Sequence, residues 1–171
     1  MIPNKITDIV LPAYYNNEFI ETNLESLVDD YLILIFYPYD FTFVCPTELN
    51  AISDQYEEFS KLNTNVVFIS CDSIYSHKAW SNIDPKEGGI KGIKYHMISD
   101  YNKKLTKQLC LLNDDGACKR ATVIIDNNMN ILHYHFNINP IGRSTKELKR
   151  IIKALKFNKN TQNICKVDWD E

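Results

Sequence analysis

The chain has 171 residues, of which 44% are hydrophobic and 24% are charged, and these proportions are ordinary for a single soluble globular domain. Its formal net charge of −3 argues against nucleic-acid binding, which usually requires a surplus of basic residues. No apolar run approaches the ~20 residues that a membrane-spanning helix needs, so we expect no membrane association.

The first half of the chain alternates apolar runs with amphipathic segments. Residues 31–37 form a continuous apolar run that predicts a buried strand, which ends at Pro38. A helix is expected over about 46–61, because apolar residues recur there at helical spacing. A second buried strand over 66–70 and a helix over about 76–82 are expected to follow.

The second half continues this alternation. We expect a short strand near 97–99, a helix over 102–110, and two strands over 121–126 and 130–136. Ser144 and Glu147 have the spacing of a capping box, which begins a final helix. This order predicts an α/β fold with a central mixed β-sheet flanked by helices on both faces.

The cysteines of the chain are Cys45, Cys71, Cys110, Cys118 and Cys165. No pair is spaced as Cys-x-x-Cys, which argues against a structural zinc site and against a local dithiol motif. The N-terminal residues lack an apolar signal segment, so we expect a cytoplasmic protein and leave open a mature organellar form. We interpret Cys71 and Cys110 as packing residues and leave the reactivity of Cys118 open.

Cys45 differs from the others because the chain delivers it from a buried strand, through a loop, to the start of a helix. Pro46 suits the first helical position, since its missing N–H would have no partner there. The unpaired N–H groups and the helix dipole favour a nucleophilic thiolate at this point. Thr42 can place a hydroxyl beside the sulfur. Glu48 would oppose the thiolate unless it is paired with a cation, so the site needs an arginine from elsewhere.

The segment around Cys45 resembles the active site of the peroxiredoxin family. Pro38, Thr42 and Cys45 reproduce its Pro-x-x-x-Thr-x-x-Cys motif, and residues 41–48, Phe-Thr-Phe-Val-Cys-Pro-Thr-Glu, match its most characteristic stretch. Further likenesses, such as residues 72–80 and 98–100, extend the resemblance over nearly the whole chain. The resemblance implies a thioredoxin-like fold and a thiol-dependent peroxidase, in which Pro38 shields the loop.

By this resemblance, Cys45 attacks hydrogen peroxide or an organic hydroperoxide and becomes a sulfenic acid, while water or an alcohol leaves. Arg120 falls where the family has its catalytic arginine, and with Thr42 it would hold the peroxide oxygens. Arg120 would also pair with Glu48, and Arg143 matches a second arginine of the family. The resemblance implies neither a cofactor nor a metal.

Cys165 is the candidate for the second, resolving thiol of the typical 2-Cys subgroup. Residues 164–169, Ile-Cys-Lys-Val-Asp-Trp, keep the Cys-x-x-x-Trp spacing of that subgroup but have Lys166 where it usually has proline. The likeness implies a homodimer with an intersubunit disulfide, with a decamer left open, and reduction by thioredoxin or a similar dithiol. We therefore divide the chain into a peroxiredoxin domain, 1–157, and a C-terminal tail with the resolving cysteine, 158–171.

Three alternatives are weighed beside this interpretation. A 1-Cys peroxidase would use Cys45 without a resolving thiol, and a redox-sensing or holdase-like oligomer would use it as a switch. A thiol–disulfide oxidoreductase would require a Cys-x-x-Cys motif, which the chain lacks. His133 and His135 share a strand face but have no third ligand at a supporting spacing, so we expect no metal site. His77 and Trp80 are expected to be packing residues.

Overall fold

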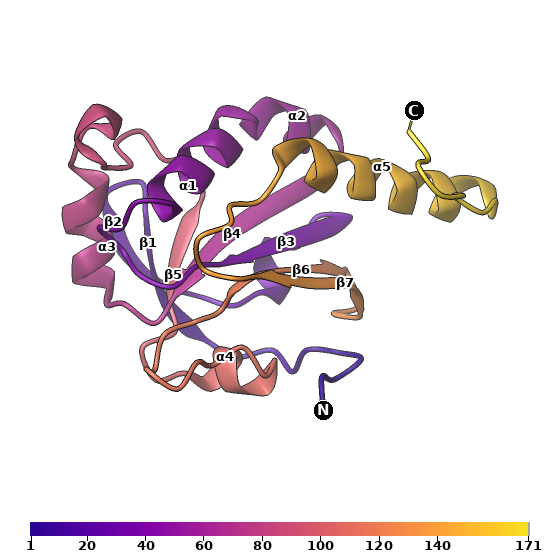
Figure 1. Cartoon of the computed structure of the whole chain (residues 1–171). Helices are drawn as coiled ribbons and strands as arrows, with labels where there is room; N and C mark the ends of the chain where they lie inside the picture. The colour runs from indigo at the N-terminus through magenta and orange to yellow at the C-terminus, as the bar shows by residue number, and fades with distance from the viewer. Residues whose placement is uncertain (171) are drawn as a thin grey trace.

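A single β-sheet forms the centre of the computed structural model, which describes residues 1–170. Its strands are β1 (Leu11–Tyr15), β2 (Glu18–Thr22), β3 (Tyr31–Phe36), β4 (Thr64–Ser70), β5 (His96–Ser99), β6 (Arg120–Asp126) and β7 (Ile131–Asn137). Their order in the sheet is β2-β1-β5-β4-β3-β6-β7 (Figure 1). The neighbours β3, β4 and β5 are parallel, whereas β6 and β1 pair antiparallel at either side of them. The sheet is therefore mixed, as the sequence predicts.

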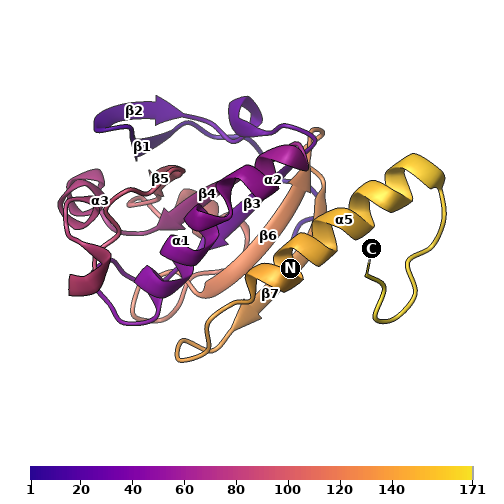
Figure 2. The same cartoon turned by 90° about the horizontal axis from the view of Figure 1, so that it is seen from above.

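Helices cover both faces of this sheet. They are α1 (Cys45–Asp54), α2 (Tyr56–Lys61), α3 (Ile74–Ser81), α4 (Lys104–Gln108) and α5 (Thr145–Thr161), with short 3-10 helices at Glu25–Leu27 and Pro85–Glu87. Seen from above, α1, α2 and α5 lie across one face (Figure 2), and α4 lies on the opposite face (Figure 1). None of the helices within residues 1–170 is long and apolar enough to span a bilayer.

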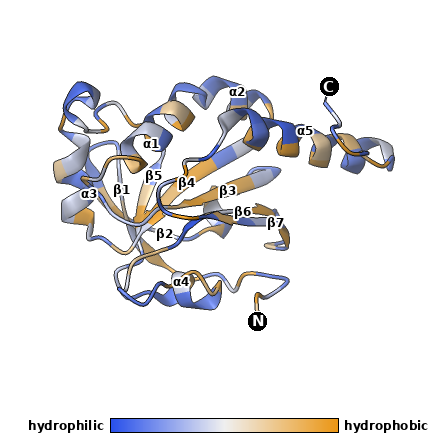
Figure 3. Ribbon diagram, in the orientation of Figure 1, coloured by the Kyte–Doolittle hydropathy of each residue, from blue (hydrophilic) through white to orange (hydrophobic). Residues whose placement is uncertain are grey.

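The central strand β3 separates two hydrophobic cores, because alternate residues of a strand point to opposite faces. Ile33 and Ile35 join the core beneath α1, α2, α3 and α5, whereas Leu32 and Leu34 join the core beneath α4. Every residue of β3 is buried. Apolar residues accordingly concentrate in the central strands, and the helices carry the polar residues outward (Figure 3).

The helix expected over 46–61 is divided into α1 and α2 by Gln55. The backbone of Gln55 has φ −92° and ψ 14°, and its N–H donates to the carbonyl of Ile52 rather than continuing the α-helical pattern. Ser53, just before the break, is buried and accepts a hydrogen bond from the backbone N–H of Lys94. The apolar stripe continues across the break, which is why its periodicity predicts one helix.

The hairpin of β1 and β2 is absent from the elements predicted from the sequence. Its strands are joined at Asn16 and Asn17, which both have positive φ, 48° and 66°. A two-residue turn with both φ values positive matches the twist of a hairpin, and asparagine tolerates that conformation. The Asn-Asn pair is thus the local signal that identifies this hairpin.

The final helix begins and ends at residues with clear capping roles. The hydroxyl of Ser144 accepts a hydrogen bond from the N–H of Glu147 at 3.3 Å, as the capping box predicts. The helix continues to Thr161 and ends at Gln162, which has φ 58°. The irregular part of the C-terminal tail therefore starts after residue 161.

Candidate active site

Cys45 is the first residue of α1, and the residue is 1% exposed. Pro46 therefore takes the second helical position rather than the predicted first, and the missing N–H of proline is equally harmless there. The hydroxyl of Thr47 donates to the carbonyl of Val44 at 2.6 Å and holds the turn in which the cysteine lies. The sulfur is thus fixed at the positive end of the helix dipole.

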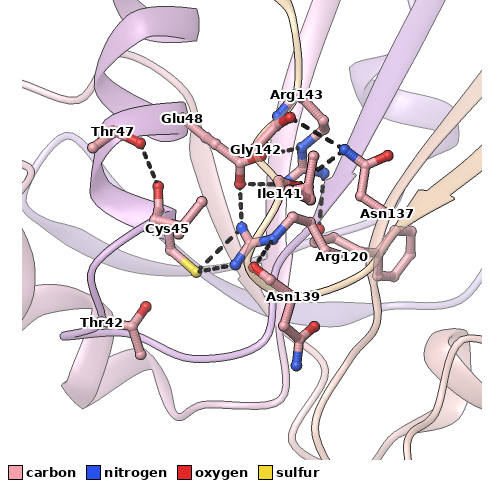
Figure 4. Close-up of polar contacts among 12 residues, drawn as sticks. Thr42, Cys45, Thr47, Glu48, Arg120, Asn137, Asn139, Ile141, Gly142 and Arg143 are labelled. Atoms are coloured by element: carbon pink, nitrogen blue, oxygen red, sulfur yellow. Dashed lines mark hydrogen bonds and ion pairs between the residues drawn. The ribbon is translucent and has the colours of Figure 1, made fainter.

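Arg120 brings its guanidinium group to this sulfur from the first position of β6. Its Nη1 and Nη2 atoms donate to Cys45 Sγ at 3.6 and 3.5 Å (Figure 4). Its Nε donates to the carbonyl of Asn139 at 3.0 Å, and Nη1 also donates to Glu48 Oε2. Because three neighbours share one planar group, the guanidinium can face the sulfur in only one orientation.

Glu48 lies between Arg120 and Arg143, and the charged groups of all three side chains are buried. Arg143 donates from Nε to Glu48 Oε1 at 3.0 Å and from Nη2 to Oε2 at 2.8 Å. Burial alone would raise the pKa of Glu48, but Arg143 and Arg120 outweigh burial and lower that pKa. Glu48 is therefore a permanent anion at neutral pH, and it fixes both guanidinium groups.

Arg143 also connects the site to the sheet. Its Nη1 donates to the carbonyls of Phe36 and Ala121 at 2.9 and 2.7 Å. These two residues are paired across β3 and β6, at the end of the sheet where the chain leaves β3 for the active-site loop. Arg143 is the second arginine that the resemblance indicates, and its contacts are structural.

The loop after β7 contributes backbone atoms that the sequence analysis did not identify. The amide of Asn137 donates to the carbonyls of Ile141 and Gly142 at 3.1 and 3.2 Å, which closes the loop on itself. The closed loop presents the Asn139 carbonyl to Arg120 and the Arg143 N–H to Glu48 Oε1. Contacts made by backbone groups cannot be predicted from the types of the residues that carry them.

Pro38 and Thr42 lie on the loop that leads to Cys45. Pro38 is buried, whereas Thr42 is half-buried and donates its hydroxyl to the carbonyl of Tyr39 at 3.0 Å. Within residues 1–170 the structure records no hydrogen bond from the Thr42 hydroxyl to the Cys45 sulfur, in contrast to the contact expected from their spacing. Thr42 faces the same side of the site as the sulfur (Figure 4).

A buried polar cluster holds the other side of this loop. Asp40 accepts a hydrogen bond from the Tyr37 hydroxyl at 2.8 Å, and its second oxygen lies 2.8 Å from His77 Nδ1. The backbone N–H of Asp40 donates to Asp72 Oδ2 at 2.9 Å. His77 is buried, as its packing role predicts, but it also joins α3 to the active-site loop. Asp40 and His77 are 37 positions apart in the chain, so local sequence patterns do not reveal this pairing.

Cys165 lies apart from Cys45 in the same chain. Its Sγ donates to the carbonyl of Ala154 at 3.5 Å, so the tail folds back along α5. Arg150 donates to the carbonyl of Trp169, whose ring lies 5.2 Å from the ring of Phe157. Both views place this tail beside the far part of α5, away from the start of α1 (Figures 1 and 2).

The described part of the chain shows no cluster of three or more His, Cys, Asp or Glu side chains that could hold a metal ion. His133 and His135 lie on β7 with nearly parallel rings whose centroids are 6.2 Å apart. Burial lowers the pKa of His133, and the neighbouring His135 lowers it further. Neither histidine approaches the sulfur of Cys45 through any recorded contact among residues 1–170.

Comparisons with known proteins identify the family to which the chain belongs. The AhpC/TSA family model matches residues 2–134. The spinach (Spinacia oleracea) protein named 2-Cys peroxiredoxin BAS1, chloroplastic, is 42% identical over 171 residues, which are 99% of this chain and 64% of that protein. The Drosophila melanogaster protein named thioredoxin-dependent peroxide reductase, mitochondrial, is 43% identical over 159 residues, which are 92% of this chain and 68% of that one.

A solved structure matches the whole arrangement. The reduced 2-Cys peroxiredoxin of Plasmodium vivax superposes with a TM-score of 0.94 at 35% identity, covering 99% of this chain and 89% of that chain. The fold is thus thioredoxin-like, as expected, and the elements that carry Cys45 and Arg120 lie within the family match. The chain therefore belongs to the AhpC/TSA family and is a peroxiredoxin, a thiol-dependent peroxidase.

Proposed function

We propose that this chain reduces hydrogen peroxide and organic hydroperoxides by attack of the Cys45 thiolate on the O–O bond. The observation that carries the proposal is the pair of contacts from Arg120 Nη1 and Nη2 to Cys45 Sγ, at 3.6 and 3.5 Å. Two N–H groups aimed at one buried sulfur stabilise the anionic form and the negative charge that moves to oxygen during attack.

Charge balance supports this assignment. Arg120 and Arg143 carry two positive charges, and the Glu48 carboxylate and the Cys45 thiolate carry two negative charges, so the ionised site is neutral as a whole. Removing a charge from water is costly unless it is paired, and here every charge has a partner within the site. The thiolate is therefore the form of the cysteine that this arrangement complements.

In the first step the sulfur bonds to one peroxide oxygen, the O–O bond breaks, and water or an alcohol leaves after taking up a proton. Arg120 would bind the oxygens as charge develops on them. The Thr42 hydroxyl now donates to the Tyr39 carbonyl, and rotation of its side chain would turn it toward the bound peroxide. Pro38 is buried at the start of the loop and restricts its backbone.

In the second step a thiol attacks the Cys45 sulfenic sulfur, the S–O bond breaks, and water leaves. We assign this role to Cys165 of the partner subunit, because Cys165 contacts α5 within its own chain rather than Cys45. The names of the similar proteins, which are 2-Cys peroxiredoxins, support a two-cysteine cycle. The chain would thus comprise a peroxidase domain, 1–157, and a tail, 158–171, that acts on the partner.

A homodimer has a suitable surface at the end of the sheet. Strand β7 is an edge strand, and apolar side chains remain exposed on it and on the loop that follows: Leu132, Phe136, Ile138 and Ile141. An exposed apolar group at an unpaired strand edge favours association with a second copy. Native mass spectrometry at low and high protein concentration would separate a dimer from a decamer.

Thioredoxin or a similar dithiol would then reduce the intersubunit disulfide. The name of the Drosophila protein states a dependence on thioredoxin, and this chain would share it. We place the reaction in the cytoplasm, although the spinach and Drosophila proteins are named chloroplastic and mitochondrial. Fluorescence microscopy of the tagged full-length protein would test that location.

The deciding experiment couples peroxide consumption to thioredoxin and combines it with non-reducing electrophoresis. Wild-type protein should consume peroxide and form a covalent dimer, and Cys45→Ser should do neither. Cys165→Ser should lose the covalent dimer. Activity of Cys165→Ser equal to wild type would instead indicate a 1-Cys mechanism, and peroxide consumption by Cys45→Ser equal to wild type would refute the role of Cys45.

A further inference from the structure

Two cysteines outside the active site lie in contact with each other. Cys71 directly follows β4, Cys118 lies two residues before β6, and their sulfurs are 3.4 Å apart. Strand β3 lies between β4 and β6, so the two sulfurs meet beyond the end of β3. Residues 47 positions apart in the chain are brought together here by the sheet itself.

The two thiols share a third polar group. The hydroxyl of Thr106 on α4 lies 3.2 Å from Cys118 Sγ and 3.8 Å from Cys71 Sγ. Thr106 and Cys118 are fully buried, whereas Cys71 is half-buried at the outer side of the pair. Cys71 is therefore the residue of the pair that is in part open to solvent and to a small oxidant.

The surroundings divide the two cysteines into different chemical roles. The hydrogen bond from Cys118 lowers the pKa of Cys71, and the Thr106 hydroxyl lowers it further. The same hydrogen bond raises the pKa of Cys118, and burial adds to that effect. Because Cys71 is also the more exposed of the two, we assign it as the partner that reacts as a thiolate and Cys118 as the partner that keeps its proton. Thiolate character and access together determine which cysteine reacts with an oxidant.

We propose that Cys71 and Cys118 form a second redox site, which peroxide converts to an intramolecular disulfide without the participation of Cys45. Closing the 3.4 Å gap to the ~2.05 Å of an S–S bond requires a movement of about 1.4 Å between the two sulfurs. The site lies on the α4 face of the sheet, in the core opposite the one that contains Cys45.

The reaction balances with peroxide as the two-electron oxidant. The Cys71 thiolate bonds to one peroxide oxygen, the O–O bond breaks, and the leaving oxygen takes up a proton and departs as water. Cys118 then bonds to the Cys71 sulfur as the S–O bond breaks, and the proton of Cys118 leaves with the hydroxyl as a second water. Two thiols lose two electrons, and one peroxide gains them.

The test uses the full chain with Cys45→Ser, Cys110→Ser and Cys165→Ser combined, so that Cys71 and Cys118 are the remaining cysteines. After hydrogen peroxide treatment, free thiols are alkylated under denaturing conditions and the intact mass is measured. We expect a monomer that is two hydrogens lighter, takes up no alkyl group, and regains both thiols with dithiothreitol. Two alkylated thiols, a covalent dimer, or a sulfinic acid without a crosslink would overturn the proposal.

Two matched variants in the same background test the assigned roles. Adding Cys118→Ser should leave a Cys71 sulfenic acid that dimedone traps, with no crosslink. Thr106→Val keeps the side-chain shape but removes the shared hydroxyl, so the crosslink should form more slowly at neutral pH; an unchanged rate would overturn the role of Thr106. Non-reducing peptide mapping of oxidised wild-type protein should show the Cys71–Cys118 link beside any link of Cys45, and its absence would count against the proposal.

Discussion

Arg143 binds both carboxylate oxygens of Glu48 from its side chain and adds a third hydrogen bond from its own backbone N–H, at 2.8 Å from Oε1. The side chains of both residues are almost wholly buried. Glu147 and Arg150 form the same kind of pair at the surface, with side chains that are about half and one-third exposed. The exposed Glu147–Arg150 pair therefore serves as the control for substitutions in the buried Glu48–Arg143 pair.

Replacing Glu48 by glutamine should destabilise the protein and slow peroxide reduction. The variant keeps the shape of the side chain but leaves two buried guanidinium groups with the Cys45 thiolate as their one counter-charge, which costs about 3 kcal/mol of unfolding free energy. Urea denaturation should show this loss, and the rate of peroxide reduction should fall with it. Glu147→Gln should cost no more than about 0.5 kcal/mol, because its pair is exposed. Equal effects of the two substitutions would contradict this account.

The contribution of Glu48 to stability should depend on pH below its ordinary pKa of 4.5. Burial raises this pKa, but the two arginines lower it overall, so the folded state holds the ionised form more tightly than the unfolded state does. The stabilisation is therefore fully present well above pH 4.5 and is lost as the pH falls through the lowered value. Unfolding free energies of wild type and Glu48→Gln should converge on acidification. A constant difference across that range would refute the assignment.

Replacing Arg120 by lysine should reduce catalytic efficiency far more than it reduces stability. A single ammonium group cannot contact Cys45, Glu48 and the Asn139 carbonyl at once, although it preserves the charge. Loss of one preorganised donor to a developing anion typically costs about 10²–10³-fold in rate. Stopped-flow measurement of peroxide reduction should show a loss of this order. Arg150→Lys, at the surface, should leave the rate unchanged.

Asp40→Asn should loosen the active-site loop from α3. The carboxylate joins the Tyr37 hydroxyl to His77 in a buried cluster, and hydrogen bonds to a charged group contribute about 1.5–3 kcal/mol. Denaturation should show a loss in that range, together with faster proteolysis of the loop. Tyr37→Phe removes one of the two hydrogen bonds to this carboxylate and should cost about 1.5 kcal/mol. An Asp40→Asn variant as stable as wild type would exclude a structural role for the cluster.

Trp169→Ala should accelerate disulfide formation by releasing the tail from α5. The ring contact between Phe157 and Trp169 is of a kind that contributes about 0.5–1.5 kcal/mol, so its loss should increase the released population by about two- to tenfold. Samples quenched at short times after peroxide addition and analysed by non-reducing electrophoresis should show that the covalent dimer forms faster. Val167→Ala, at an exposed position of the same tail, is the control and should not change the rate.

The features that sequence predicts here are those encoded within a short stretch of chain. The strand, loop and helix around Cys45 and the capping box at Ser144 depend on near neighbours, and the motif around Cys45 identifies the chemistry. Resemblance places Arg120 and Arg143 at the site, but the Asn139 carbonyl that orients Arg120 is a backbone atom with no sequence signature.

Contacts between distant residues are the ones that sequence patterns do not predict. From the sequence, His77 is predicted to be a packing residue, but in the fold it lies beside Asp40. Cys71 is likewise predicted to be a core residue, but in the fold its sulfur lies beside that of Cys118. In both cases the residue type fits burial alone, and only the topology supplies the polar partner. The break at Gln55 is not predicted for a related reason, because an apolar stripe does not indicate a single residue that leaves the helical conformation.

In the proposed two-cysteine cycle, the burial of Cys45 limits the rate at which the disulfide can form. A cysteine residue that is 1% exposed leaves no room for a cysteine of another polypeptide to contact its sulfur. The first turn of α1 must therefore melt locally before a disulfide can form, so the free energy of that opening governs how long the sulfenic acid survives. Substitutions that strengthen this turn, with no change to any reacting group, would prolong exposure of the intermediate to further oxidation. The stability of the first turn of α1 would therefore determine how often the sulfenic acid is oxidised further, which inactivates the enzyme.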